Sequence, residues 1–244
     1  MHNSVPFWPD LSARARGIER MEENDCPHDE LWRTVDQFDV INRYLARYRT
    51  IYYRHVLGKM LHEPHRLYTV IDLGAGGCDI PVWLLTQASR LGLNVQIEAW
   101  DHDPRMVAYA RHKINDEPRL RVRQAHALED LPEQPVDFVI SNHFLHHLTD
   151  EQGITLITRW AAVTRKQLIF NDLARSRWSY AGFYLLTLLL GRGTFHRHDG
   201  LLSIRRGFTR AELSRMANQA GFPNAHTVES WLPGRLVLTV NGQA

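Results

Sequence analysis

The pattern of hydrophobic and polar positions changes twice along the chain, near residues 66 and 172. Before the first change, apolar and aromatic residues recur at helical spacing and predict two helices within residues 11–61, separated near 24–28. Pro64 ends this pattern, and a run typical of a strand starts at Tyr68. We therefore expect residues 1–66 to form a helical lid that contributes to substrate binding.

Between the two changes, strand-like runs alternate with helical patterns. The expected strands are 68–73, 95–100, 120–123, 136–141 and 167–171, and the expected helices are 80–91, 104–115 and 151–163. Strands that are separated by helices pair in parallel, and the helices cover both faces of the sheet. The pattern predicts a Rossmann-like α/β fold.

The third part of the chain has a different order of elements. An apolar helix is expected over 179–190, a loop over 191–207, and a helix from Thr209 that Glu212 closes with a capping box. Two β-runs, 226–231 and 235–240, flank a Pro-Gly turn and predict an antiparallel hairpin. We expect residues 67–244 to be one domain with an inserted cap at about 176–207.

Composition narrows the class of protein. The 244 residues contain 29 Lys+Arg, 27 Asp+Glu and two cysteines, so a disulfide scaffold is excluded and no strong global field favours nucleic acid. The first ten residues lack the pattern of a signal peptide, and the apolar run 183–190 is too short to cross a bilayer. We expect a cytoplasmic globular protein, monomeric or homodimeric.

A glycine-rich loop joins the first expected strand to the next helix. Gly74 and Gly76 allow a sharp turn and a close approach to a ligand, but no Gly-Lys-Ser/Thr follows. Asp79 occupies the third glycine position of the dinucleotide pattern and would repel a pyrophosphate. Asp101 follows the second strand, where a carboxylate can accept hydrogen bonds from both hydroxyls of a ribose. The ligand is therefore not expected to be a dinucleotide.

These residues belong to two motifs, VIDLGAGG at 70–77 and WDHDPRM at 100–106. They resemble the first two motifs of class I S-adenosylmethionine-dependent methyltransferases, and the resemblance covers roughly residues 68–172. It implies that the glycine loop cradles the methionine part of the cofactor, that Asp101 holds the ribose, and that His102 and Met106 flank the adenine. The residues that the resemblance assigns to the cofactor are Asp72, Gly74, Ala75, Gly76, Asp101, His102, Met106, His126, Ala127 and Asn142.

The third and fourth motifs of the family differ in how well they match. His126 and Ala127 lie where the family usually has Gly-Asp-Ala, so a histidine stands in the place of an adenine-contacting acid. The run 136–148 resembles the end of strand four in small-molecule methyltransferases, with Asn142 where the strand meets the cofactor. The turn that follows is expected to face the transferable methyl group.

Candidate catalytic residues come from this turn and from the next strand. If the acceptor is a phenol or an enol, His146 is the first choice of base and Asp172 the second, against the simpler roles of a turn histidine and a capping carboxylate. His143, His146 and His147 have a spacing that suggests a metal, but no Cys or carboxylate completes the set, so no metal is expected.

The candidate substrate-binding residues are Tyr44, Tyr48, His147 and His198. The two tyrosines lie among arginines at helical spacing, which favours a lid helix whose aromatic side chains line a pocket. The same combination could stack RNA bases and contact phosphates, and we keep an RNA methyltransferase and a non-catalytic cofactor-binding module as alternatives.

The flanking segments carry a further resemblance. Residues 19–21, 43–48, 171–175, 197–200 and 203–208 look like bacterial methyltransferases associated with polyketide or other phenolic secondary metabolites. This resemblance implies O-methylation of a small hydrophobic or aromatic acceptor in secondary metabolism. C-methylation of a quinone or pyrone ring is the near alternative.

Overall fold

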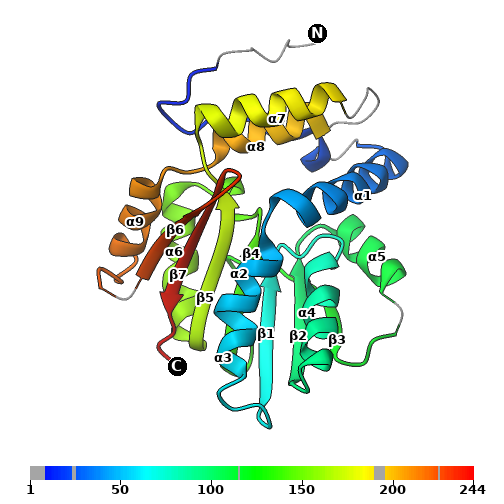
Figure 1. Cartoon of the computed structure of the whole chain (residues 1–244), viewed down its shortest axis with the longest axis vertical. Helices are drawn as coiled ribbons and strands as arrows, with labels where there is room; N and C mark the ends of the chain where they lie inside the picture. The colour runs from blue at the N-terminus through cyan, green and yellow to red at the C-terminus, as the bar shows by residue number, and fades with distance from the viewer. Residues whose placement is uncertain (1–8, 24–25, 115, 190–195, 225) are drawn as a thin grey trace.

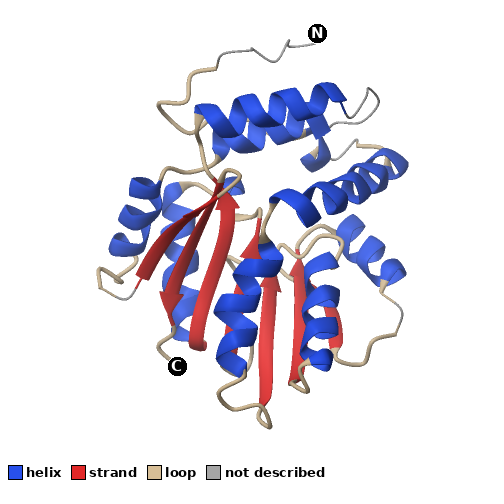
Figure 2. Ribbon diagram, viewed as in Figure 1, coloured by secondary structure: helices blue, strands red, loops and turns tan. Residues whose placement is uncertain are grey.

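The computed structural model describes residues 9–23, 26–114, 116–189, 196–224 and 226–244, and its centre is a seven-stranded sheet of order β3-β2-β1-β4-β5-β7-β6. The strands are β1 (Leu67–Leu73), β2 (Asn94–Asp101), β3 (Leu120–Gln124), β4 (Val136–Asn142), β5 (Thr164–Leu173), β6 (His226–Trp231) and β7 (Arg235–Asn241). The first five strands pair in parallel, and β7 is antiparallel to both β5 and β6. The expected Rossmann-like sheet with a terminal hairpin is confirmed (Figure 2).

Helices cover both faces of this sheet. One face carries α2 (Tyr48–Tyr52), a π-helical turn (Tyr53–Leu57), α3 (Gly58–Met60), α4 (Asp79–Arg90) and α5 (Pro104–Lys113), and the other carries α6 (Asp150–Ala162) and α9 (Arg210–Gln219). The neighbouring residues Val70 and Ile71 of β1 belong to separate buried clusters, because successive side chains of a strand point to opposite faces. Within the described residues, every helix falls short of the length and apolar character that a membrane crossing requires.

Three further helices lie at the end of the sheet toward which the parallel strands point: α1 (His28–Leu45), α7 (Arg177–Leu189) and α8 (His196–Arg206) (Figure 1). Helices α7 and α8 pack together through Tyr180, Leu201 and Ile204. Two short 3-10 turns, Arg20–Glu22 and Leu145–His147, face this layer. The layer forms a cover over the carboxyl ends of the strands.

The prediction of a loop over 191–207 is wrong, because α8 occupies His196–Arg206. Residues 190–195 lie outside the part of the chain that the structure describes. Gly200 made this helix hard to recognise. A Cβ at Gly200 would lie 2.4 Å from the Phe183 ring, so the glycine permits close packing of α8 on α7. Leu201 and Ile204 then bury the helix face, and tertiary packing outweighs the weak helix propensity of the sequence.

The expected helix before residue 24 is also wrong. The N-terminal segment, Leu11–Glu23, has no regular secondary structure apart from the turn Arg20–Glu22. Its backbone groups also bond to the cover helices: the Ala15 N–H donates to the Arg205 carbonyl at 3.0 Å. The Asp199 carboxylate accepts the N–H groups of Arg20 and Met21 at 2.9 and 3.1 Å. The segment is therefore fixed across α8.

Arg175 connects this segment to the rest of the cover. Its Nε donates to the Leu11 carbonyl at 3.0 Å, and its Nη1 donates to the Gly207 carbonyl at 2.7 Å. Both Nη atoms bond the Glu212 carboxylate, at 2.9 and 2.6 Å. The Arg175 side chain is 1% exposed, so this fork of hydrogen bonds is shielded from water.

We expect Arg175→Met to lower the free energy of unfolding by about 3 kcal/mol, because it removes the guanidinium while the Glu212 carboxylate and two carbonyls keep their places. Urea denaturation followed by circular dichroism measures the change. Arg210→Met, at an exposed position one residue into α9, is the control and should change stability by less than about 0.5 kcal/mol. Equal effects of the two substitutions would contradict the structural role of Arg175.

Candidate active site

A cavity of about 1080 Å³ lies beneath the cover, at the carboxyl ends of β1, β2 and β4. The strand order reverses between β1 and β4, since β2 and β3 lie on one side of β1 and β5 on the other side of β4. Open α/β sheets bind their ligands at this kind of switch point. Pockets for one drug-sized ligand measure roughly 300–1,000 Å³, so this cavity has room for a nucleoside-type ligand and a second small molecule.

The glycine loop forms one wall of the cavity. Gly74 and Gly76 both have positive φ, 67° and 50°, in the region that glycine adopts most easily. The N–H groups of Gly74 and Ala75 donate to the Trp100 carbonyl at 2.9 and 3.0 Å, which joins the loop to the end of β2. A Cβ at Gly74 would lie 2.7 Å from the Phe144 ring, whereas one at Gly76 would meet nothing within 4 Å. The backbone at Gly76 thus borders open space in which a ligand can approach it.

Three carboxylates, Asp72, Asp79 and Asp101, line the same end of the cavity. Burial, followed by the charges of Asp79 and Asp101, raises the pKa of Asp72 well above its ordinary value. Burial also raises the pKa of Asp101. A bound cation relieves such repulsion between carboxylates, so this end of the cavity suits an ammonium group and disfavours a pyrophosphate.

Asp101 has hydrogen-bonding capacity left for a ligand. One oxygen accepts the Gly76 N–H at 3.0 Å and the other the Asp103 N–H at 2.9 Å, whereas a carboxylate offers about four acceptor positions. The rings of His102 and His126 stand edge to face nearby, with centroids 5.8 Å apart. Nδ1 of His126 is buried without a hydrogen-bond partner among the described residues. These groups fit the hydroxyls and the polar base of a nucleoside.

His146 and Asp172 form a buried pair at the other end of the cavity, 2% and 1% exposed. Nδ1 of His146 lies 2.7 Å from Oδ1 of Asp172, and the His146 backbone N–H donates to Oδ2 at 3.1 Å. Because Nδ1 is bonded to a carboxylate, it carries a proton in either charge state, and Nε2 is the atom that can gain or lose one. The end of β5 thereby orients a histidine from the turn after β4.

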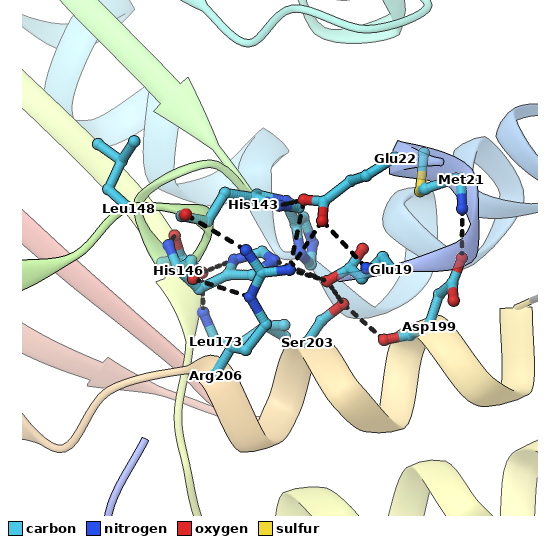
Figure 3. A network of polar contacts seen from close by, with 12 residues as sticks. Glu19, Met21, Glu22, His143, His146, Leu148, Leu173, Asp199, Ser203 and Arg206 are labelled. Carbon is cyan, nitrogen blue, oxygen red and sulfur yellow. Dashed lines mark hydrogen bonds and ion pairs between the residues drawn. The ribbon is translucent and has the colours of Figure 1, made fainter. Parts of the chain in front are cut away.

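Glu19 of the N-terminal segment approaches the opposite side of the imidazole. Its Oε1 lies 3.7 Å from Nε2 of His146, and the Glu19 residue is 2% exposed. The Ser203 hydroxyl donates to the same oxygen at 2.7 Å, and Nη1 of Arg206 lies 3.5 Å away (Figure 3). Residues separated by more than 120 positions in the sequence therefore meet around one ring.

These charges set the protonation of His146. Burial lowers the pKa of the imidazole, but Asp172 and Glu19 outweigh this effect and raise it to about 9. In Asp172, burial is outweighed by the attraction and hydrogen bond of His146, and the pKa lies below its ordinary value. At neutral pH and in this arrangement, His146 is an imidazolium between two carboxylates.

Glu22 makes a second link between the N-terminal segment and the turn. It contacts Nδ1 of His147 through Oε1, and its Oε2 lies 3.1 Å from Nη1 of Arg206. Burial raises the pKa of Glu22, but the hydrogen bond with His147 and the charges of His147 and Arg206 lower it to about 2. The network keeps the segment closed over the turn (Figure 3).

One group of side chains in the described part of the chain meets the distances of a metal site. Ligand atoms of Glu19, His146 and His147 lie within 4.8 Å of one another. The sequence predicted no metal because no carboxylate stands near the histidines along the chain, and the fold supplies Glu19. Oε1 of Glu19 already has the Ser203 hydroxyl and the Arg206 guanidinium as neighbours, so the carboxylate is satisfied without an ion.

Arg235, the first residue of β7, contributes a buried guanidinium to the cavity wall and is 2% exposed. Its Nε and Nη2 donate to the side-chain and backbone oxygens of Asn171 at 3.0 and 2.9 Å. Its Nη2 also lies 3.3 Å from Oδ1 of Asn142, and its Nη1 lies 2.9 Å from Nε2 of His143. His143 has a positive φ of 58°, a strained conformation that occurs mainly at functional sites.

The structure brings most of the predicted site residues together. Every residue of the predicted cofactor set lines the cavity, as do His146 and His147, and Asp172 lies directly behind His146. The expected placement of Tyr44, Tyr48 and His198 at the pocket is wrong, because none of them lines it. Tyr44 is 72% exposed, Tyr48 is buried against Trp83, and the His198 ring pairs with Asp199 on α8.

Four residues near His146 at this end of the cavity were not identified as site residues from the sequence: Glu19, Ser203, Arg206 and Arg235. The first three lie in the flanking segments that resemble bacterial methyltransferases of secondary metabolism. This resemblance was the signal that could have identified them as site residues. Arg235 gave no comparable signal, because a single arginine at the start of an apolar strand is commonly a solvated edge residue.

Comparisons with known proteins agree with this geometry. A family model described as a methyltransferase domain matches residues 70–167. An uncharacterized methyltransferase of Geobacillus sp. (strain WCH70) is 25% identical over 193 residues, which cover 72% of this chain and 86% of that protein.

Solved structures share the fold at low identity. Magnesium protoporphyrin IX methyltransferase from Synechocystis PCC 6803 with bound S-adenosylhomocysteine superimposes with a TM-score of 0.58 at 16% identity, over 90% of this chain and 96% of that chain. Human N-acetylserotonin methyltransferase in complex with S-adenosylmethionine gives 0.61 at 16% identity, over 89% and 57%. An O-methyltransferase family protein from Burkholderia thailandensis gives 0.59 at 17% identity, over 91% and 63%.

The motifs, the family model and the fold lead to one assignment. The glycine loop, Asp72 and Asp101 lie at the switch point of a sheet whose strand order matches the expected Rossmann-like fold. The matching family model covers the segment that carries these residues. The chain is a class I S-adenosylmethionine-dependent methyltransferase, and S-adenosylmethionine is its cofactor.

Proposed function

We propose that the protein transfers the methyl group of S-adenosylmethionine to a hydroxyl oxygen of a small phenolic or enolic acceptor. The observation that carries this proposal is the buried pair of His146 and Asp172, which borders the same cavity as the glycine loop. A proton-accepting imidazole is useful when the acceptor is a hydroxyl, because the oxygen loses its proton as it gains the methyl group.

The cofactor residues keep the roles that the sequence motifs imply. Asp101 would accept hydrogen bonds from the ribose hydroxyls through its remaining lone pairs. Asp72 and the glycine loop would hold the ammonium group of S-adenosylmethionine. His102, Met106, His126 and Ala127 would surround the adenine, and Asn142 would lie near the reacting centre. When bound, S-adenosylmethionine supplies an electrophilic methyl group on a sulfonium.

The residues of the chain then align the acceptor and handle its proton. Asp172 fixes the imidazole through Nδ1, and Nε2 of His146, which lies 3.7 Å from Glu19 at the cavity wall, can take the hydroxyl proton when it is unprotonated. The N-terminal segment, with Met21 and Glu22 on the cavity wall, excludes water from the reacting atoms. Most contacts of the polar network around His146 hold this segment closed over the site.

A small acceptor fits this arrangement better than RNA. His146 lies beneath the N-terminal segment and α8, whereas the exposed tyrosines Tyr44 and Tyr53 lie on the outer side of the N-terminal helices. The flanking motifs resemble methyltransferases of polyketide and phenolic secondary metabolism, and one structural relative is named as an O-methyltransferase family protein. We therefore favour a phenolic or enolic secondary metabolite as the acceptor.

His146→Ala should lower kcat by about a hundredfold or more for a phenolic acceptor, since it removes the proton acceptor. The affinity for S-adenosylhomocysteine, measured by calorimetry, should change by less than about threefold because His146 belongs to the acceptor end. His62→Ala, at an exposed position away from the cavity, is the matched control. A normal kcat in His146→Ala would remove this histidine from the mechanism.

Asp101→Ala should weaken S-adenosylmethionine binding by about 10-fold to 100-fold, because hydrogen bonds to a charged group contribute about 1.5–3 kcal/mol. Isothermal titration calorimetry gives the dissociation constant directly. Glu133→Ala, an exposed acidic position, controls for the loss of one negative charge. Unchanged affinity in Asp101→Ala would refute the ribose assignment.

The pH dependence of kcat/KM reports the free enzyme and tests the charge arrangement around His146. For a phenol that stays un-ionised over the range, kcat/KM should rise with pH and level off near a pKa of about 9. Glu19→Gln removes a negative charge that favours the imidazolium, so the rising limb should move to lower pH. A limb that keeps its position in Glu19→Gln would show that it does not report His146.

A further inference from the structure

Arg235 places a positive charge in the acceptor end of the cavity without an acidic partner. Its hydrogen-bond partners are Asn171, Asn142 and His143, all neutral oxygen or nitrogen acceptors, and it forms no ion pair with a carboxylate among the described residues. By contrast, the buried Arg175 and Arg206 each contact a glutamate. Buried guanidinium groups are ordinarily paired with anions, so the exception at Arg235 needs an explanation.

The electrostatic environment of Arg235 agrees with this geometry. Burial lowers its pKa to about 10, and the charge of Asp172 opposes the change only in part. The guanidinium is still protonated at neutral pH. It therefore carries a full charge next to a cavity that has room for a small molecule besides the cofactor.

His143 adds a neutral donor beside this charge. Burial and the charge of Arg235 lower the pKa of His143 well below its ordinary value, so the ring is neutral. Nη1 of Arg235 donates to one ring nitrogen of His143, and in a neutral imidazole the other nitrogen carries the proton. Arg235 has five N–H hydrogens, of which its protein partners use four. The pair thus retains one N–H on the guanidinium and one on the imidazole.

Arg235 and His143 line the same cavity as His146, the proton acceptor of the proposed function. The ring centroids of His143 and His146 are 6.3 Å apart, and Nη1 of Arg235 lies 2.9 Å from Nε2 of His143. A ring that places its hydroxyl at His146 can direct a second oxygen toward Arg235. Phe183, Leu186 and Leu232 supply apolar wall to the same cavity.

We infer that Arg235, with His143, binds a second oxygen of the acceptor, and that this oxygen is a carbonyl conjugated with the reacting hydroxyl. The substrate class is then a phenol or enol that bears a conjugated carbonyl. When such a hydroxyl loses its proton to the unprotonated form of His146, the negative charge is shared with the carbonyl oxygen, and Arg235 gains an anionic hydrogen-bond partner. This inference rests on the proposed function and names its substrate class.

Two probes of nearly equal size test the inference. Both 4-hydroxyacetophenone and 4-ethylphenol are phenols that are mainly neutral at neutral pH. The first has a conjugated carbonyl group where the second has a methylene group. Calorimetric titration into the full-length enzyme saturated with S-adenosylhomocysteine should show that wild-type protein binds the ketone about tenfold more tightly. Equal affinity for the two probes, or no binding of the ketone, overturns the inference.

Substitution of Arg235 separates recognition from a structural role. In Arg235→Gln, the preference for 4-hydroxyacetophenone should fall to less than about threefold, whereas the affinities for 4-ethylphenol and S-adenosylhomocysteine stay within about twofold. Arg235→Lys keeps the charge and should retain part of the preference. An equal loss of affinity for both probes in Arg235→Gln would show that the arginine only supports the ends of the strands, and it would overturn the inference.

The outcomes distinguish this inference from the proposed function. If the enzyme methylates the oxygen of both probes with equal kcat/KM and binds them equally, the proposed function stands and the inference fails. If binding depends on the carbonyl and on Arg235 but neither probe, nor any other phenol or enol, is methylated on oxygen, the proposed function fails and Arg235 remains a recognition residue.

Discussion

The contact between Asp172 and His146 determines how the acceptor end of the cavity is organised. Asp172 lies at the end of a buried parallel strand and accepts hydrogen bonds from both the ring Nδ1 and the backbone N–H of His146. A carboxylate in that position would be costly alone, and the imidazolium compensates it. The second side of the ring then needs a partner, which Glu19 supplies from the N-terminal segment. The cover of the site is thereby coupled to the charge of one histidine.

The cavity has two ends with different electrostatic character. Burial and the charges of Asp79 and Asp101 raise the pKa of Asp72, and burial raises the pKa of Asp101. This end suits a cationic ligand, which agrees with S-adenosylmethionine as the cofactor. The other end combines the His146 imidazolium with the buried charge of Arg235. In the proposed function, the positively charged methyl donor would lie against the carboxylates, and an acceptor that develops negative charge would lie beside His146 and Arg235, which favours their approach.

Local sequence signals were sufficient for the sheet, the glycine loop and Asp101, because alternating periodicity, glycine spacing and a strand-end acid are read within a few residues. They also selected His146 and Asp172 as candidates, and the fold brings these two side chains together as a buried pair. They were insufficient for α8, where Gly200 packs against Phe183, and for Glu19, whose importance depends on contacts with residues more than 120 positions away. Tyr44 and Tyr48 show the opposite error, because helical spacing predicted them at the pocket. In the fold, Tyr44 faces solvent and Tyr48 is buried in the core.

The most direct test of the account is the position of the transferred methyl group. The enzyme is supplied with S-adenosylmethionine labelled with ¹³C in the methyl group and with a set of phenolic and enolic acceptors that includes 4-hydroxyacetophenone, and the products are examined by ¹³C NMR. The account predicts that the label is found on the hydroxyl oxygen. Label on a ring carbon, or transfer to RNA and to none of the small acceptors, would contradict it.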